Sequence, residues 1–115
     1  MIALILTALV ALIHLYITWL EMVLWTKPRG RATFGTTEAF AEESKVLAAN
    51  QGIYNGMVAL GLIYGLAAQN PVVQALFLIF VLVVGLYGGL TVGRKILLVQ
   101  ALPAALALIA MMVGV

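Results

Sequence analysis

The sequence contains no cysteine, and only 9% of its 115 residues are charged. Without cysteine, the chain has no disulfide framework, no thiol nucleophile and no thiolate metal site. Six basic and four acidic residues give a net charge of +2, which is too small and too scattered to indicate a nucleic-acid partner. A chain that is 65% hydrophobic is far more apolar than a typical soluble domain. We therefore expect membrane lipid around it and no nucleic acid.

Four apolar runs are each close to the roughly 20 residues that a membrane-spanning helix needs. An isolated strand cannot satisfy its backbone hydrogen bonds in lipid, so each run is predicted to be a helix. Short connections make neighbouring helices antiparallel. The prediction is an all-α, integral membrane, four-helix up-down bundle that forms a single domain over residues 1–115. The expected helices cover residues 2–25, 38–68, 72–93 and 96–115.

The basic residues all fall in or beside the first and third connections, at Lys27, Arg29, Arg31, Lys45, Arg94 and Lys95. The second connection, Gln69-Asn70-Pro71, has no charge. The positive-inside rule places the basic connections in the cytoplasm and both termini outside. In the first connection, Pro28 and Gly30 are expected to end the first helix and turn the chain. The N-terminus lacks a basic region and a cleavage pattern, which favours a retained membrane anchor over a signal peptide.

The first apolar run carries two ionisable residues, His14 and Glu21. Ionisable groups at membrane depth are costly and usually have a partner or a function. Seven residues make about two helical turns, so His14, Thr18, Glu21 and Trp25 are predicted to line one helix face. We interpret this face as one wall of a polar pocket.

Polar residues of the other three helices are predicted at the same depth, in the cytoplasmic half of the bilayer. They are Asn50, Gln51, Tyr54 and Asn55 on the second helix, Tyr87 on the third and Gln100 on the fourth. A pocket shared by all four helices is one interpretation. The alternative is that Thr18, Thr91 and Gln51 join helices by hydrogen bonds. Two further alternatives are an ion pair of Glu21 with Lys45 or Arg94, and a purely structural His14.

Gly-x3-Gly pairs on the second and third helices indicate close helix packing and make a homo-oligomer conceivable. They are Gly52 and Gly56, Gly61 and Gly65, Gly85 and Gly89, and Gly89 and Gly93. Pro103 removes one backbone hydrogen bond and frees a carbonyl near Val99. One histidine and one nearby glutamate are too few for a metal site, so none is predicted, and no cofactor is identified.

The polar motifs resemble those of an uncharacterised bacterial membrane family, catalogued as domain of unknown function 1304. The resemblance rests on His14-x6-Glu21, Asn50-Gln51-Gly52-x-Tyr54-Asn55-Gly56, Gly85-x-Tyr87-Gly88 and Gln100-x2-Pro103-Ala104. It implies a small four-helix membrane protein and supplies no activity. We expect a multi-pass protein of the bacterial inner membrane.

Two better-understood families are similar in architecture only. The membrane-associated eicosanoid and glutathione metabolism proteins have four helices and a polar face on the second helix. Of their glutathione motif only Asn55 keeps its identity, and Leu47 stands where the motif has Arg. The small multidrug resistance transporters have a glutamate within the membrane in their first helix, and Glu21 is the corresponding feature of this sequence.

Three functions are consistent with these residues, and the sequence leaves open whether the protein is an enzyme. In the first, a pocket holds a small amphipathic or lipid-soluble molecule, with His14 and Glu21 as the acid–base (catalytic) pair. The ligand would be bound by Asn50, Gln51, Tyr54, Asn55, Tyr87 and Gln100. In the second, the protein is a proton-coupled transporter that uses Glu21. In the third, it is a structural membrane protein without a ligand.

Overall fold

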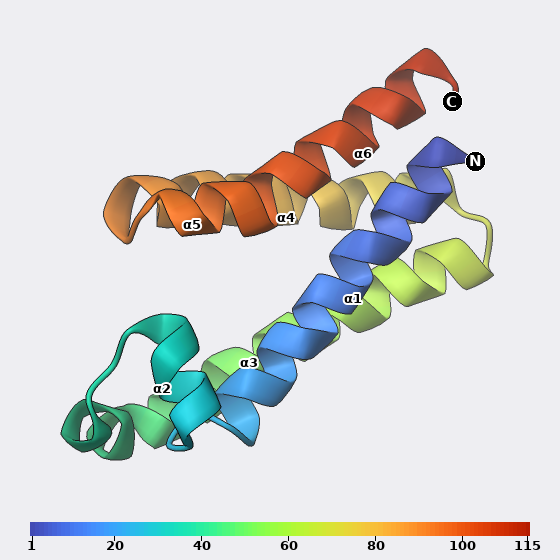
Figure 1. Cartoon of the computed structure of the whole chain (residues 1–115). Helices are drawn as coiled ribbons and strands as arrows, with labels where there is room; N and C mark the ends of the chain where they lie inside the picture. Colours follow the sequence, from blue (N-terminus) through green and yellow to red (C-terminus); the bar gives the residue numbers. More distant parts are fainter. The chain divides into compact units, whose positions relative to one another are not determined.

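The structure is a computed structural model that describes all residues, 1–115, and it consists of helices without strands (Figure 1). The helices in chain order are α1 (Ile2–Met22), α2 (Pro28–Phe34), α3 (Glu38–Ala67), α4 (Pro71–Thr91), α5 (Arg94–Ile96), the π-helical turn η1 (Leu97–Ala101) and α6 (Leu102–Val113). Four helical segments are long and apolar enough to cross a membrane: α1, α3, α4 and the continuous run Arg94–Val113. The predicted all-α fold with four long apolar helices is confirmed, and the side of the membrane on which the termini lie stays a prediction.

The chain forms two compact units. The larger unit comprises Met1–Ile13 and Val58–Val115, and the smaller unit comprises His14–Met57. Both α1 and α3 contribute residues to each unit, because each helix continues across the division in the sequence. The single domain over residues 1–115 stays a prediction.

The larger unit has a core of small and branched apolar side chains: Val10, Ala11, Val58, Leu62, Leu78, Val81, Ala104 and Ala107. Small residues let its helices approach closely. A Cβ atom added at Gly61 would lie 2.3 Å from the Phe77 ring, and one added at Gly85 would lie 2.7 Å from the backbone nitrogen of Ala101. Close packing at these glycines, which the sequence predicted, holds α4 against α3 and against η1.

The last apolar helix is interrupted in its first turns by η1, which ends two residues before Pro103. Proline has no N–H to donate to the carbonyl of Val99, so the regular α-helical bonding fails at this point. The chain adopts a wider turn instead, in which the Leu102 N–H donates to the Leu97 carbonyl. In lipid, such π-type adjustments provide partners for backbone groups that a proline has freed.

The smaller unit is built from the end of α1, the short helix α2 and the beginning of α3. Helix α2 was not predicted: Pro28 does not simply turn the chain but starts a helix, a position where proline's missing N–H costs nothing. Helix α1 ends at Met22, so Trp25 lies beyond the helix and does not continue the face of His14, Thr18 and Glu21 as predicted.

Gly30 allows α2 to lie against the chain that leaves α1. A Cβ atom at this position would lie 1.9 Å from the carbonyl oxygen of Leu24 and 3.1 Å from the Cα of Trp25. Both neighbours are backbone atoms, so no side-chain rotation relieves the clash. Only glycine fits here, and it fixes the segment that connects α1 to α3.

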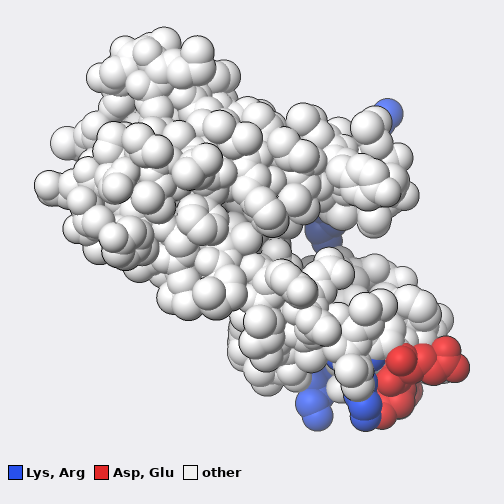
Figure 2. Space-filling view, turned by 180° about the vertical axis from the view of Figure 1, so that it is seen from behind, with Lys and Arg blue, Asp and Glu red and all other residues white.

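The charged residues of the smaller unit gather over α2 and the beginning of α3, as Figure 2 shows. The Thr37 hydroxyl accepts a hydrogen bond from the Phe40 N–H (3.1 Å) and so caps the beginning of α3. Glu38 follows in the first turn, where a negative charge is favourable. This end of the unit is therefore the part that is suited to water.

Candidate functional site

The end of α1 packs closely on α3 through two glycines. A Cβ atom at Gly52 would lie 3.3 Å from the Cβ of Glu21, and one at Gly56 would lie 3.4 Å from the Cγ2 of Thr18. Asn55 is three residues after Gly52 and one before Gly56, so it lies on the same side of α3. The glycines thus bring Asn55 within reach of the polar face of α1.

Glu21 and Asn55 form the central polar contact of the smaller unit. The Asn55 Nδ2 donates a hydrogen bond to the Glu21 Oε1 at 2.5 Å. Glu21 is buried, with 5% of its surface exposed. The second carboxyl oxygen, Oε2, has no hydrogen bond from the protein. The amide therefore orients the carboxyl group and leaves one oxygen able to bind a further donor.

Glu21 lines an open pocket of about 340 Å³, which we call the Glu21 pocket. Its lining comes from the end of α1, the segment that follows it and the beginning of α3. The lining residues are Glu21, Met22, Val23, Trp25, Thr26, Lys45, Val46 and Ala49. The pocket thus combines one acidic and one basic side chain with a mostly apolar wall, and its volume lies within the about 300–1,000 Å³ of small-molecule sites.

The Trp25 side chain is held in place on two sides. Its Nε1 donates to the Ser44 Oγ (3.0 Å), and its ring lies 5.0 Å from the Phe34 ring, between centroids. The Ser44 hydroxyl in turn donates to the Phe40 carbonyl (2.7 Å). These contacts connect the loop after α1 to both α2 and α3, and they make the indole a fixed wall of the Glu21 pocket.

Lys45 forms its ion pair with Glu42, three residues earlier on the exposed surface of α3. The alternative in which Glu21 pairs with Lys45 is therefore not what the structure shows, because Glu21 is bonded to Asn55. An exposed pair of this kind is weak. The Lys45 ammonium can thus exchange Glu42 for an anionic group in the pocket at little cost.

His14, Thr18 and Thr91 do not take part in the hydrogen bond between Glu21 and Asn55. His14 is buried, with 2% of its surface exposed. The Thr18 hydroxyl donates to the His14 carbonyl (2.7 Å), and the Thr91 hydroxyl donates to the Tyr87 carbonyl (2.8 Å). The alternative in which the Thr18 and Thr91 hydroxyls join helices by hydrogen bonds is wrong, since each hydroxyl donates to a backbone carbonyl of the helix that carries it.

The remaining predicted ligand-binding residues are not gathered around Glu21 in the smaller unit. Asn50, Gln51 and Tyr54 are exposed on α3, and Asn50 and Tyr54 lie about half a turn away from Gly52. Tyr87 and Gln100 belong to the larger unit. Their participation in one pocket with Glu21 stays a prediction.

Two buried polar residues, Thr7 and Gln74, were not among the predicted site residues, which were all placed in the cytoplasmic half of the bilayer. Thr7 is fully buried and donates to the Ala3 carbonyl (2.7 Å). Gln74 is 3% exposed, and its Nε2 donates to the Gly65 carbonyl (2.9 Å). The sequence does contain an indication of the role of Gln74. A glutamine one turn inside an apolar helix needs a hydrogen-bond partner, and the short connection between α3 and α4 brings the end of α3 close to it.

No group of three or more histidine, cysteine, aspartate or glutamate side chains is placed to hold a metal ion. The polar groups at or beside the Glu21 pocket are the carboxyl group of Glu21, the amide of Asn55 and the ammonium group of Lys45. Together these groups can bind a polar head, and the carboxyl group can exchange a proton.

The four long apolar helices and the few polar side chains buried among them are those of a multi-pass membrane protein. The chain belongs to the family described as "Protein of unknown function (DUF1304)", whose model matches residues 8–112, and the predicted resemblance is thereby confirmed. It is similar to the "Uncharacterized protein YpaA" of Lactococcus lactis subsp. lactis (strain IL1403), with 44% identity over 110 residues, which cover 91% of this chain and 92% of that protein. No solved structure matches the chain.

Proposed function

We propose that the protein binds a small amphipathic molecule in the Glu21 pocket. The observation that carries the proposal is the free oxygen of the Glu21 carboxyl group. Asn55 bonds to the other oxygen of this group, and the rest of the pocket lining is mostly apolar. A buried carboxyl group is costly in a membrane protein unless it has a function or a partner. The single hydrogen bond from Asn55 accounts for one of its two oxygens.

The two charged residues of the pocket suggest the kind of head group. A donor on the ligand, such as an ammonium or hydroxyl group, would bond to the Glu21 Oε2. An anionic group would meet the Lys45 ammonium in place of Glu42. The apolar lining, including Met22, Val23 and Val46, would contact the apolar part of the ligand. A zwitterionic head group on a short alkyl chain fits these three requirements together.

In this proposal Glu21 and His14 remain the acid–base pair. Glu21 would accept a proton from the bound head group, and His14, buried seven residues earlier on the same helix, would be its proton partner. Asn50, Gln51, Tyr54, Tyr87 and Gln100 remain proposed ligand-binding residues.

We also propose that the Glu21 pocket opens on the cytoplasmic side of the bacterial inner membrane. Four of the six basic residues, Lys27, Arg29, Arg31 and Lys45, belong to the unit that contains the pocket. Basic residues near membrane helices favour the cytoplasmic side. The absence of cysteine makes a direct test simple, because a single introduced thiol has no competitor.

The topology is tested with Ala32→Cys, an exposed position on α2. A membrane-impermeant maleimide is expected to label this variant in inverted membrane vesicles and to leave it unlabelled in intact cells. Labelling in intact cells would contradict the proposed orientation.

Ligand binding is tested by mass spectrometry of the small molecules that co-purify with the protein. Ala49→Trp fills the pocket, whereas Leu47→Trp adds the same side chain at an exposed position of α3 outside the lining. We expect an amphipathic species with the wild type and with Leu47→Trp that is lost with Ala49→Trp. The same retained molecules in all three proteins would contradict the proposal.

A further inference from the structure

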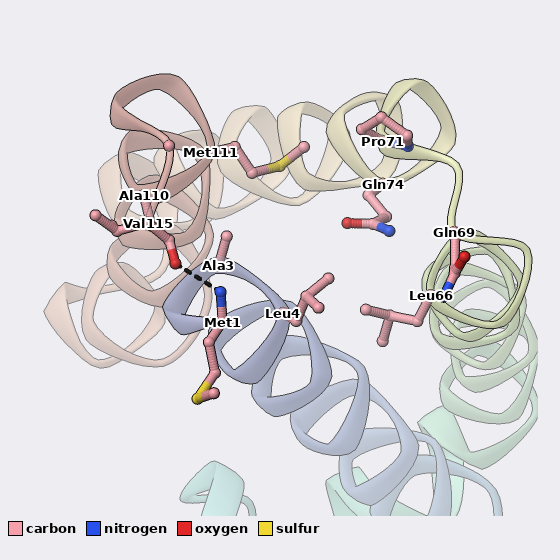
Figure 3. Close-up of a pocket in the computed structure, with 11 residues that line it drawn as sticks. Met1, Ala3, Leu4, Leu66, Gln69, Pro71, Gln74, Ala110, Met111 and Val115 are labelled. Atoms are coloured by element: carbon pink, nitrogen blue, oxygen red, sulfur yellow. Dashed lines mark hydrogen bonds between the residues drawn. The ribbon is translucent and has the colours of Figure 1, made fainter.

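The larger unit contains a second pocket, of about 460 Å³, which we call the Gln74 pocket. Its lining comes from the beginning of α1, the end of α3, the connection to α4 and the beginning of that helix, and the C-terminal end of the chain from α6 onward, as Figure 3 shows. The lining residues are Met1, Ala3, Leu4, Leu66, Gln69, Pro71, Gln74, Ala110, Met111, Gly114 and Val115. None of these side chains is acidic, basic or a histidine, so this pocket differs in kind from the Glu21 pocket.

The buried polar side chain of this pocket is Gln74, and its orientation is fixed by chemistry. A backbone carbonyl only accepts hydrogen bonds, so the amide nitrogen, not the oxygen, must face the Gly65 carbonyl. The amide oxygen consequently points the other way, into the space between Leu4 and Met111 (Figure 3). No hydrogen bond from the protein reaches this oxygen. A residue with 3% of its surface exposed thus presents one unused acceptor to the pocket.

We propose that the Gln74 pocket binds an uncharged amphiphile with a hydroxyl head group, whose O–H donates to the Gln74 Oε1. The proposal concerns a different pocket from the proposed function and stands or falls separately from it. An acceptor without charge selects a donor without charge, because a buried charge with no partner is strongly disfavoured. The apolar walls formed by Leu4, Leu66 and Met111 suit an alkyl or ring body.

Two other occupants fit the lining less well. A water molecule needs two to four polar partners and fills only a small part of such a volume. An anionic amphiphile would have to use the α-ammonium group of Met1, which already donates to the Val115 carbonyl (2.7 Å) in an exposed position. A solvated group of this kind discriminates little between head groups, whereas the buried amide of Gln74 does.

The test uses photolabelling of the full-length protein in lipid nanodiscs, with labelled residues mapped by mass spectrometry. The probes are a dodecanol that carries a diazirine in its chain, the methyl ether of the same molecule, and the corresponding dodecyl phosphate. The alcohol and the ether differ only in the O–H donor. We expect the alcohol to label residues of the Gln74 pocket at least fivefold more than the ether does, and the phosphate to label them no better than the ether does.

Variants separate the pocket from the stability of the unit. Leu66→Trp fills the pocket and leaves the Gln74–Gly65 bond intact, and we expect it to reduce labelling by the alcohol at least fivefold. Leu60→Trp adds the same side chain at an exposed position of α3 outside the lining and should label as the wild type does. Gln74→Leu should reduce labelling by the alcohol to the level of the ether.

Three results would overturn the proposal. They are equal labelling by alcohol and ether in the wild type, unchanged labelling in Leu66→Trp, and stronger labelling by the phosphate than by the alcohol. If Gln74→Leu fails to fold, the comparison of alcohol and ether on the wild type and on Leu66→Trp still decides the outcome.

Discussion

Each unit contains a side-chain amide that donates a hydrogen bond to an oxygen atom, and the two units differ in the charge of the oxygen that is left without a protein donor. In the smaller unit the Asn55 amide donates to the carboxyl group of Glu21, and in the larger unit the Gln74 amide donates to the Gly65 carbonyl. Each bond leaves one oxygen without a protein donor and at the wall of a pocket. The oxygen belongs to an ionisable group in one unit and to a neutral amide in the other. We infer that a membrane chain with only ten charged residues can form two chemically distinct pockets, because the free oxygen belongs to Glu21 in one pocket and to Gln74 in the other.

The largest expected loss of stability comes from replacing a glycine that contacts backbone atoms, and each unit contains such a glycine. Gly30→Ala places a methyl group against the Leu24 carbonyl, and Gly85→Ala places one against the Ala101 nitrogen. Overpacking of this kind costs about 1–3 kcal/mol, and we expect Gly30→Ala to be at the upper end because its contact is the closer. Thermal unfolding in detergent, followed by circular dichroism, measures the difference.

Gly93→Ala is the control for these two substitutions, since a Cβ atom at Gly93 meets nothing within 4 Å. We expect its midpoint to stay near that of the wild type. A Gly30→Ala protein as stable as Gly93→Ala would contradict the packing of α2 on the Leu24 carbonyl.

The next effect concerns the polar contact of the smaller unit. Asn55→Leu removes the only protein donor to the buried carboxyl group of Glu21, and an unsatisfied buried polar group costs about 1–3 kcal/mol. Glu21→Gln keeps an acceptor for Asn55 and should cost less. Denaturant titration in mixed micelles gives the free energies of unfolding, and the double variant gives the coupling energy. Additive effects would show that Asn55 does not act through Glu21.

The equivalent contact in the larger unit should matter less for stability. Gln74→Leu removes a hydrogen bond to the Gly65 carbonyl, which also accepts one from the Asn70 N–H (2.9 Å). No carbonyl is left without a donor, so we expect a loss of about 0.6 kcal/mol, the average for polar contacts between membrane helices. The same titration tests this value, and a loss equal to that of Asn55→Leu would remove the distinction between the units.

The smallest expected effect on stability is that of Lys45→Ala. The exposed Lys45–Glu42 pair contributes about 0.3–0.5 kcal/mol or less. The same substitution removes the basic group of the Glu21 pocket, so it should weaken the binding of a zwitterionic amphiphile while leaving the unfolding midpoint nearly unchanged. A loss of binding that follows a loss of stability would indicate a structural role instead.

The length and composition of the apolar runs were sufficient to predict the four long helices, since a long apolar run in lipid satisfies its backbone as a helix, but they did not predict the short helix α2. The predicted start of the second helix at residue 38 agrees with Glu38, because Thr37 and the glutamates are recognisable capping signals. The predicted end of the first helix was three residues too late. Val23 and Leu24 are as apolar as the helix before them, and only the close contact of Gly30 with the Leu24 carbonyl reveals the break.

The candidate site was predictable in part. Depth and helical spacing singled out Glu21 and Asn55, which the structure joins by a hydrogen bond. Trp25 was predicted on the same helix face as Glu21, whereas it lines the pocket from the segment beyond α1. Lys45 was considered as a basic residue beside the first connection and as an ion-pair partner of Glu21, because its position beside the pocket depends on how the chain turns after α1. Gln74 was overlooked because hydropathy averages one glutamine into an apolar run, whereas its importance comes from the single carbonyl that it faces.

The difference between the two pockets is tested most directly by labelling both of them in one nanodisc preparation of the wild-type protein. One probe is the diazirine-bearing dodecanol, and the other carries a phosphoethanolamine head group on the same chain. We predict that the zwitterionic probe labels residues around Glu21, Lys45 and Ala49, and that the alcohol labels residues around Leu4, Gln74 and Met111. If the two probes label the same residues to the same extent, the two pockets do not select between head groups, which would contradict both proposed sites.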